Sequence, residues 1–99
     1  MRAVIWSEAA RTDYLAILRH IAAADPDAAE RVVDSIEATG NALGAFAMGH
    51  PGRVAGTYEK SVQGLPYIIA YALTDGDSTV SVLRVIHTAR DWQDESWPE

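Results

Sequence analysis

The 99-residue sequence contains no cysteine, and its three histidines, His20, His50 and His87, are widely separated. The lack of thiols excludes a disulfide framework, a thiolate metal site and a cysteine nucleophile. The histidines do not have the close spacing of zinc ligands, so we expect no metal and no cofactor. A chain without cysteine is also compatible with a reducing compartment.

The chain also lacks any apolar run near the roughly 18 residues that span a bilayer, and its N-terminal residues do not have the form of a secretory signal. We therefore expect a cytoplasmic protein with no membrane partner. The length suits one domain, residues 1–99, with a single hydrophobic core.

Positive charge is scarce, because the chain has a single lysine, Lys60, and a net charge of −6. Broad electrostatic binding to nucleic acid depends on lysines and arginines that neutralise phosphates, so this composition argues against it. Residues 50–90 carry a net charge of +1, whereas residues 1–49 carry −3 and residues 91–99 carry −4. The net-positive part therefore lies in the second half of the chain.

Hydrophobic periodicity predicts two helices and four strands in the order β-α-α-β-β-β. Ser7 is a suitable N-cap for the first helix, while Asp25 and Pro26 can end that helix and begin the second. Gly40 should weaken or bend the second helix. The strands are predicted at 2–6, 57–62, 65–73 and 79–86, the helices at 8–24 and from 26 onwards, and a loop at 47–56. The fold class is therefore α+β, with the helical hairpin packed on one face of a mainly antiparallel twisted sheet.

Polar and aromatic residues cluster where the last predicted strand ends, namely Arg84, His87, Arg90 and Trp92. Arg84 is flanked by apolar residues, and a buried guanidinium needs a partner. An ion pair with Glu59 across the sheet is the simplest structural interpretation. His87 suits either a proton donor or a histidine that closes the sheet. Both a structural and a functional role are therefore open for this cluster.

Five motifs in order resemble the RelE/ParE superfamily of bacterial toxins. They are V-I-W-S-E-A-A at 4–10, D-P-x-A-A-x-R at 25–31, G-R at 52–53, P-Y-I-I-A-Y at 66–71 and L-R-V-I-H-T-A-R-D-W at 83–92. The resemblance implies the toxin of a type II toxin-antitoxin system. Its partner would be a ParD-like antitoxin that represses their promoter through a ribbon-helix-helix or similar domain. Operator DNA would then be bound only through the antitoxin.

Members of this superfamily differ in their targets, because RelE- and YoeB-like toxins cleave messenger RNA on ribosomes whereas ParE-like toxins poison DNA gyrase. Cleavage needs a group that activates the 2′-hydroxyl, cations around the phosphate and a proton donor, which Glu59, Arg84 and His87 could supply. Ile68, however, stands where many nuclease members have an arginine, and Thr88 replaces the tyrosine of the YoeB-like ending. We therefore favour gyrase inhibition without RNA cleavage, and no catalytic residue.

Two sets of residues are candidates for contacts with partners. The side chains predicted to face the target are Arg53, Arg84, His87, Arg90 and Trp92. The antitoxin is expected to lay an apolar helix across the hairpin and an extended segment against the sheet. Its candidate contacts are Tyr14, Ile17, Ile21, Val33 and Ile36. The alternative functions are a RelE/YoeB-type endonuclease and a degenerate, non-toxic homologue that still binds an antitoxin.

Overall fold

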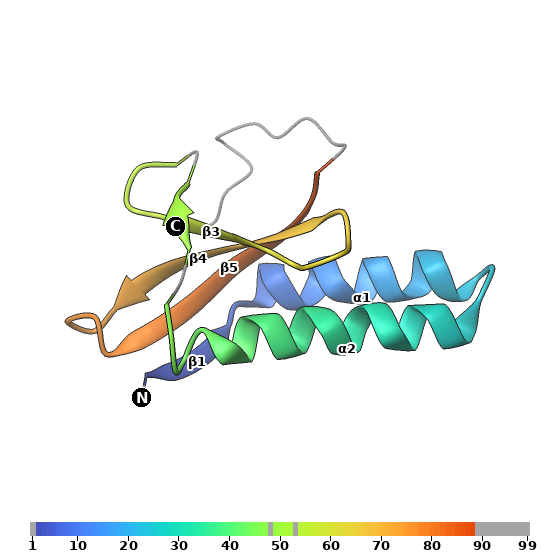
Figure 1. The fold of residues 1–99 in the computed structure, drawn as a ribbon, viewed down its shortest axis with the longest axis horizontal. Helices are drawn as coiled ribbons and strands as arrows, with labels where there is room; N and C mark the ends of the chain where they lie inside the picture. The colour runs from blue at the N-terminus through green and yellow to red at the C-terminus, as the bar shows by residue number, and fades with distance from the viewer. Residues whose placement is uncertain (1, 48, 53, 89–99) are drawn as a thin grey trace.

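A helical hairpin lies on one face of a five-stranded sheet (Figure 1). The computed structural model describes residues 2–47, 49–52 and 54–88. The elements are β1 (Ala3–Trp6), α1 (Glu8–Ala22), α2 (Pro26–Ala42), β2 (His50–Pro51), β3 (Tyr58–Ser61), β4 (Tyr67–Thr74) and β5 (Thr79–His87). The α+β fold class is confirmed, and β2 is an additional short strand inside the predicted loop. Neither helix is both long enough and apolar enough to cross a membrane, within the residues that the structure describes.

The strand order is β1-β5-β4-β3-β2, so the first strand of the chain pairs with the last. β1 runs parallel to β5, with Val4 opposite Val80 and Trp6 opposite Val82. The other neighbouring strands are antiparallel. A parallel pair needs a long crossover connection, and the chain between β1 and β5 includes the hairpin and the other strands. The sheet is therefore mainly antiparallel, as predicted, except at β1.

Side-chain caps begin both helices, as the sequence predicts. Ser7 Oγ accepts a hydrogen bond of 3.0 Å from the Ala10 amide, and Asp25 Oδ1 accepts one of 3.1 Å from the Ala28 amide. Pro26 occupies the start of α2. These caps satisfy amides that have no partner within the helix.

Gly40 allows the indole ring of Trp6 to lie directly against the backbone of α2. A Cβ at this position would lie only 2.6 Å from Trp6 Cη2, closer than any unstrained contact. Trp6 Nε1 donates to Asn41 Oδ1 at 3.1 Å, and its ring meets Tyr14 edge-on. The helix continues through Gly40 to Ala42. The weakening predicted after Gly40 therefore falls in the last residues of the helix. The close approach of Trp6 requires a residue without a side chain at this position.

The core lies between the hairpin and the helix-facing side of the sheet. Alternate residues of a strand point to opposite faces, so one row from each central strand faces the helices. These rows and the helices contribute the buried cluster Ala10, Ile36, Leu43, Val62, Tyr67, Ile69, Tyr71, Val80, Val82 and Val85. One continuous core therefore joins α1 and α2 to β4 and β5.

The hydroxyl of Tyr71 is buried in this core and has no hydrogen-bond partner among the described residues. Burial raises the pKa of Tyr71 above its ordinary value of 10.0, while the nearby Gly49 backbone acts in the opposite direction. The geometry at Gly49 falls short of a hydrogen bond, so the hydroxyl counts as unsatisfied. An unsatisfied buried polar group destabilises the folded state.

Tyr71→Phe should therefore raise the free energy of unfolding at neutral pH, by about 1 kcal/mol. Because its pKa is raised in the folded state, Tyr71 keeps its proton at a pH where the unfolded chain loses it. The pH-dependent part of the wild-type stability that comes from this group is therefore fully present below about pH 10 and is lost as the pH rises through the folded-state pKa. The phenylalanine variant should lose less stability over that alkaline range. Urea denaturation of both proteins at neutral and alkaline pH measures the effect. A less stable variant at pH 7 would indicate that the hydroxyl has a partner after all.

Candidate functional site

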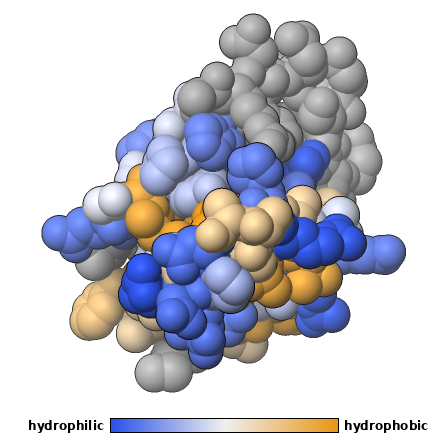
Figure 2. Space-filling model, turned by 90° about the vertical axis from the view of Figure 1, so that its right-hand side faces the viewer, coloured by the Kyte–Doolittle hydropathy of each residue, from blue (hydrophilic) through white to orange (hydrophobic). Residues whose placement is uncertain are grey.

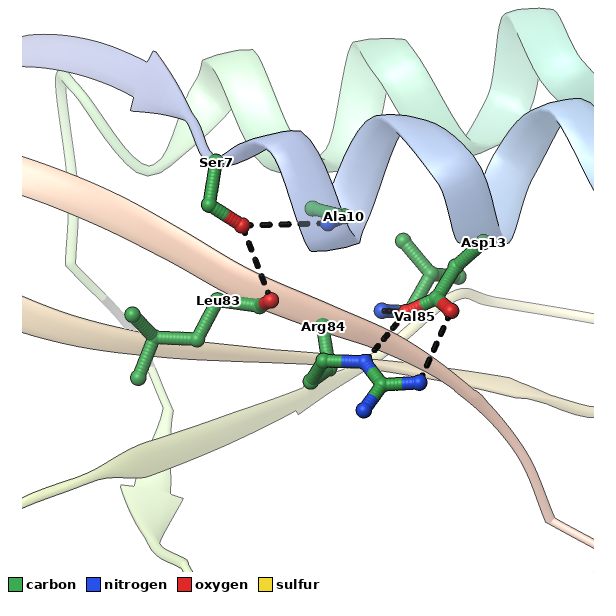
Figure 3. Close-up of polar contacts among 6 residues, drawn as sticks. All are labelled: Ser7, Ala10, Asp13, Leu83, Arg84 and Val85. Carbon is green, nitrogen blue, oxygen red and sulfur yellow. Dashed lines mark hydrogen bonds and ion pairs between the residues drawn. The ribbon is translucent and has the colours of Figure 1, made fainter. Parts of the chain in front are cut away.

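Arg84 of β5 is held by Asp13 of α1 (Figure 3). Its Nε donates to Asp13 Oδ2 at 2.8 Å, and its Nη2 donates to Oδ1 at 2.9 Å. The side chains of Arg84 and Asp13 are only 17% and 13% exposed. The hydrogen bond to Asp13 raises the pKa of Arg84, which outweighs the opposing effect of burial. A bidentate pair of this kind fixes the orientation of both groups.

Two side chains from the start of α1 also complete the hydrogen bonding of β5 where β1 ends. β1 pairs with β5 only as far as Val82. Beyond it, Ser7 Oγ donates to the Leu83 carbonyl at 2.9 Å, and the Val85 amide donates to Asp13 Oδ2 at 2.9 Å (Figure 3). These contacts occupy backbone groups that a strand edge would otherwise leave open.

We call Ser7, Asp13 and Arg84 the α1–β5 clasp, because they join the first helix to the last strand. The sequence correctly predicts that Arg84 needs a carboxylate, and Asp13, which that interpretation does not name, supplies one. The sequence does contain a pattern from which the role of Asp13 could have been predicted. It lies three residues after Ala10 and four before Ile17, on the stripe of α1 that packs against the sheet. An acid on a buried stripe requires a nearby cation.

The three residues considered for RNA cleavage do not share one face of the sheet. Glu59 pairs with Ala70, and both alternate with residues of the helix-facing row, so their positions lie on the face turned away from the helices. The side chain of Arg84 is instead directed to Asp13 of α1. His87 pairs instead with Tyr67, a residue of the helix-side core, and the two rings meet edge-on at 5.3 Å. Because cross-strand neighbours share a face, the sheet separates His87 from the Glu59 position.

The nuclease candidate Glu59 and the remaining target-facing candidates give less information. Glu59 is only 5% exposed and lies beside Gly52. Arg53, Arg90 and Trp92 lie outside the described residues. Within residues 2–47, 49–52 and 54–88, no group of three or more histidine or carboxylate side chains could hold a metal ion.

The hairpin residues considered for antitoxin contacts fall into two groups. Val33 and Ile36 are buried in the core, at 9% and 0% exposure, so they offer no surface to a partner in this structure. Tyr14, Ile17 and Ile21 are half-buried. Of this set, only the three residues on α1 could therefore contact a partner at the surface.

Residues 4–92 match the family described as the ParE toxin of the type II toxin-antitoxin system parDE. The chain belongs to the ParE toxin family. The matched residues run from β1 to beyond β5 and include the whole α1–β5 clasp. The resemblance to the RelE/ParE superfamily is therefore confirmed, and the protein is a ParE-like toxin of a type II toxin-antitoxin system.

Individual relatives agree with this assignment. Over 69 residues, which are 69% of each protein, the chain is 41% identical to Putative toxin Y4kP of Sinorhizobium fredii. A chain of the chromosomal ParDE system from P. aeruginosa superposes with a TM-score of 0.81 at 22% identity, covering 88% of this toxin and 96% of that chain. A chain of the RelBE2 toxin-antitoxin complex from Mycobacterium tuberculosis gives 0.59 at 22% identity, with 87% and 96% covered. The two structures show that the fold is shared.

Proposed function

We propose that this ParE-family toxin inhibits DNA gyrase in the cytoplasm without cleaving RNA. We also propose that a ParD-like antitoxin neutralises it and alone connects it to operator DNA. The solved relatives come from toxin-antitoxin systems, which supports an antitoxin partner. The choice of gyrase over the ribosome rests on the site residues.

The observation that carries this choice is the engagement of Arg84. Catalysis of phosphoryl chemistry by a cation depends on donors aimed at the charge that develops on the phosphate. In Arg84, both Nε and Nη2 are directed to Asp13, whose carboxylate balances the guanidinium charge. Arg84 therefore acts as a structural residue in the α1–β5 clasp, and a nuclease would have to use another cation.

Two further features support the same choice. His87 lies on the helix-facing side of the sheet, away from the face that carries the Glu59 position. The net charge of −6 provides little electrostatic attraction to ribosomal RNA. A protein that contacts another protein does not need a basic surface.

Purified toxin should therefore reduce DNA supercoiling by gyrase and raise the amount of gyrase cleavage complex, in proportion to its concentration. Messenger RNA on translating ribosomes should remain intact at the same concentrations. The cognate antitoxin should restore supercoiling when it is added at equal molarity. Cleaved messenger RNA together with unaffected gyrase would refute the proposal, whereas no effect in either assay would favour the non-toxic homologue.

Arg84→Ala in the same two assays separates a structural role from a contact with the target. If Arg84 belongs only to the clasp, inhibition per folded molecule should be unchanged, while the fraction of folded protein falls. Near-ultraviolet circular dichroism measures that fraction. A fully folded Arg84→Ala toxin that no longer inhibits gyrase would place Arg84 at the target surface.

A further inference from the structure

The outer side of the helical hairpin carries charges of opposite sign on its two helices. The buried stripes of α1 and α2 pack toward the sheet, and residues three or four apart on the outer side form rows along each helix. The basic row of α1 consists of Arg11, Leu15 and Arg19, all exposed. The acidic row of α2 consists of Glu30, Asp34 and the half-buried Glu37. We call the two rows together the hairpin face.

The charges of the hairpin face are not neutralised within the molecule. None of its five charged side chains forms an ion pair with another residue in the part of the chain that the structure describes. Acids three or four residues apart on a helix repel one another, so the acidic row is unfavourable while it stays uncovered. A surface that brings cations to this row and carboxylates to the basic row would relieve both.

The two rows lie in register along the hairpin. Arg11 and Glu37 line the same hollow of about 370 Å³ between the helices, together with Trp6, Tyr14 and Asn41. The helices run in opposite directions from this hollow (Figure 1). Arg19 is eight residues further along α1 and Glu30 is seven residues back along α2, so both lie roughly 11 Å nearer to the turn. A basic and an acidic row therefore run side by side, level with each other.

This pattern makes the hairpin face complementary to a copy of itself. A two-fold axis that runs between the helices and parallel to them would place α1 of each copy on α2 of the other. Arg11 would then face the partner's Glu37, and Arg19 would face the partner's Glu30. Such an interface is isologous, because the same patch serves both copies. A foreign helix of a single charge sign would be repelled by one of the two rows.

The size and polarity of the hairpin face indicate a weak contact. Leu15, which is 45% exposed, lies between the two arginines and provides an apolar centre within a charged rim. The hairpin end of the molecule is mostly hydrophilic, with hydrophobic side chains in separate patches (Figure 2). Two helices of this length cover about 22 by 20 Å, or roughly 450 Å². Interfaces of standard size bury about 800 Å² on each partner, so association should depend on concentration.

We propose that the free toxin forms a two-fold symmetric dimer through the hairpin face, with the basic row of each copy on the acidic row of the other. This inference goes beyond the proposed function, because it requires neither gyrase nor an antitoxin. The net charge of −6 on each copy opposes association. That repulsion is screened beyond about 8 Å at physiological ionic strength, whereas directly apposed rows are closer than this.

Charge complementation between two variants tests the proposal. Arg11→Glu/Arg19→Glu gives both helices acidic rows, and Glu30→Lys/Glu37→Lys gives both helices mainly basic rows. In sedimentation velocity, wild-type toxin should change from monomer to dimer as its concentration rises, whereas each variant alone should stay monomeric over that range. An equimolar mixture of the two variants should restore the dimer, because every row then meets one of opposite sign. A wild type that stays monomeric, or a mixture that does, would overturn the proposal.

A matched control separates the hairpin face from net charge. Arg31→Glu/Lys60→Glu changes the net charge by as much as Arg11→Glu/Arg19→Glu does, but Arg31 and Lys60 line hollows on the other flank of α2, beside β3. This control should dimerise within about threefold of the wild-type dissociation constant. Far-ultraviolet circular dichroism checks that all variants are folded. Loss of the dimer in the folded control would attribute the effect to net charge and refute the interface.

A pair of apolar variants tests the centre of the interface without changing charge. Leu15→Ala should weaken dimerisation by about tenfold, because two leucine side chains lose buried contact in each dimer. The control is Ile5→Ala, since Ile5 is 55% exposed and lies between Val4 and Trp6, which pack against the core. Its side chain therefore points away from the helices. Equal dimerisation of the two variants would overturn the assignment of this face.

Discussion

Asp13→Ala should lower the free energy of unfolding by about 3 kcal/mol, a large part of the stability of a domain this size. The substitution leaves the mostly buried Arg84 guanidinium without its carboxylate and the Val85 amide without its acceptor. Both losses act in the same direction, because removing one partner of a mostly buried ion pair and leaving an amide without its acceptor each destabilise the folded state. Urea denaturation followed by tryptophan fluorescence measures the change.

Two other variants sharpen this prediction. Asp34→Ala removes an exposed acid from α2 and should change stability by no more than about 0.5 kcal/mol. Asp13→Asn keeps a carbonyl oxygen that can accept from Val85 but loses the charge, so it should fall between wild type and Asp13→Ala. If Asp13→Ala were as stable as Asp34→Ala, the clasp would not contribute measurably to folding.

Gly40→Ala should destabilise the toxin by about 2 kcal/mol, because the new methyl group would overlap the indole ring of Trp6. The intrinsic preference of helices predicts the opposite sign, a gain of about 1 kcal/mol from replacing an interior glycine by alanine. The sign of the change therefore decides between packing and propensity. Urea denaturation again measures it, with Ala38→Gly as the control in the same helix. That exposed site should show the propensity effect alone, a loss of about 1 kcal/mol.

A second substitution at the contact tests whether the ring is responsible. Trp6→Phe shortens the side chain that reaches Gly40, so Gly40→Ala should be less harmful in the Trp6→Phe background than in wild type. The resulting coupling energy between the two positions should be at least about 0.5 kcal/mol. Strictly additive effects would mean that the ring does not constrain position 40.

Features fixed by neighbouring residues could be predicted from the sequence. Ser7, Asp25 and Pro26 mark helix ends through contacts within one turn, and the alternation of Val80 and Val82 marks a strand. Pairing between distant segments could not be predicted in this way. The parallel partnership of β1 with β5 leaves no local pattern, and β2, a two-residue strand, is too short to have one.

In the candidate site, too, features set by neighbouring residues could be predicted and features set by distant segments could not. The need of Arg84 for a carboxylate follows from its apolar neighbours, but the choice between Asp13 and Glu59 depends on how α1 crosses the sheet. Gly40 was predicted from propensity alone to weaken the helix, since the approach of Trp6 depends on β1. The roles of Arg53, Arg90 and Trp92 remain predictions from sequence.

The pairing of β1 with β5 has a consequence for the order of events during synthesis. Val4 is among the first residues made, but its partner Val80 emerges from the ribosome only after the hairpin and β4. Contacts between segments so distant in sequence form late and slow the folding of a chain. We therefore expect the sheet to close only after almost the whole toxin has been translated. An incomplete nascent chain would then lack β5, and with it the partner that Asp13 finds in the α1–β5 clasp.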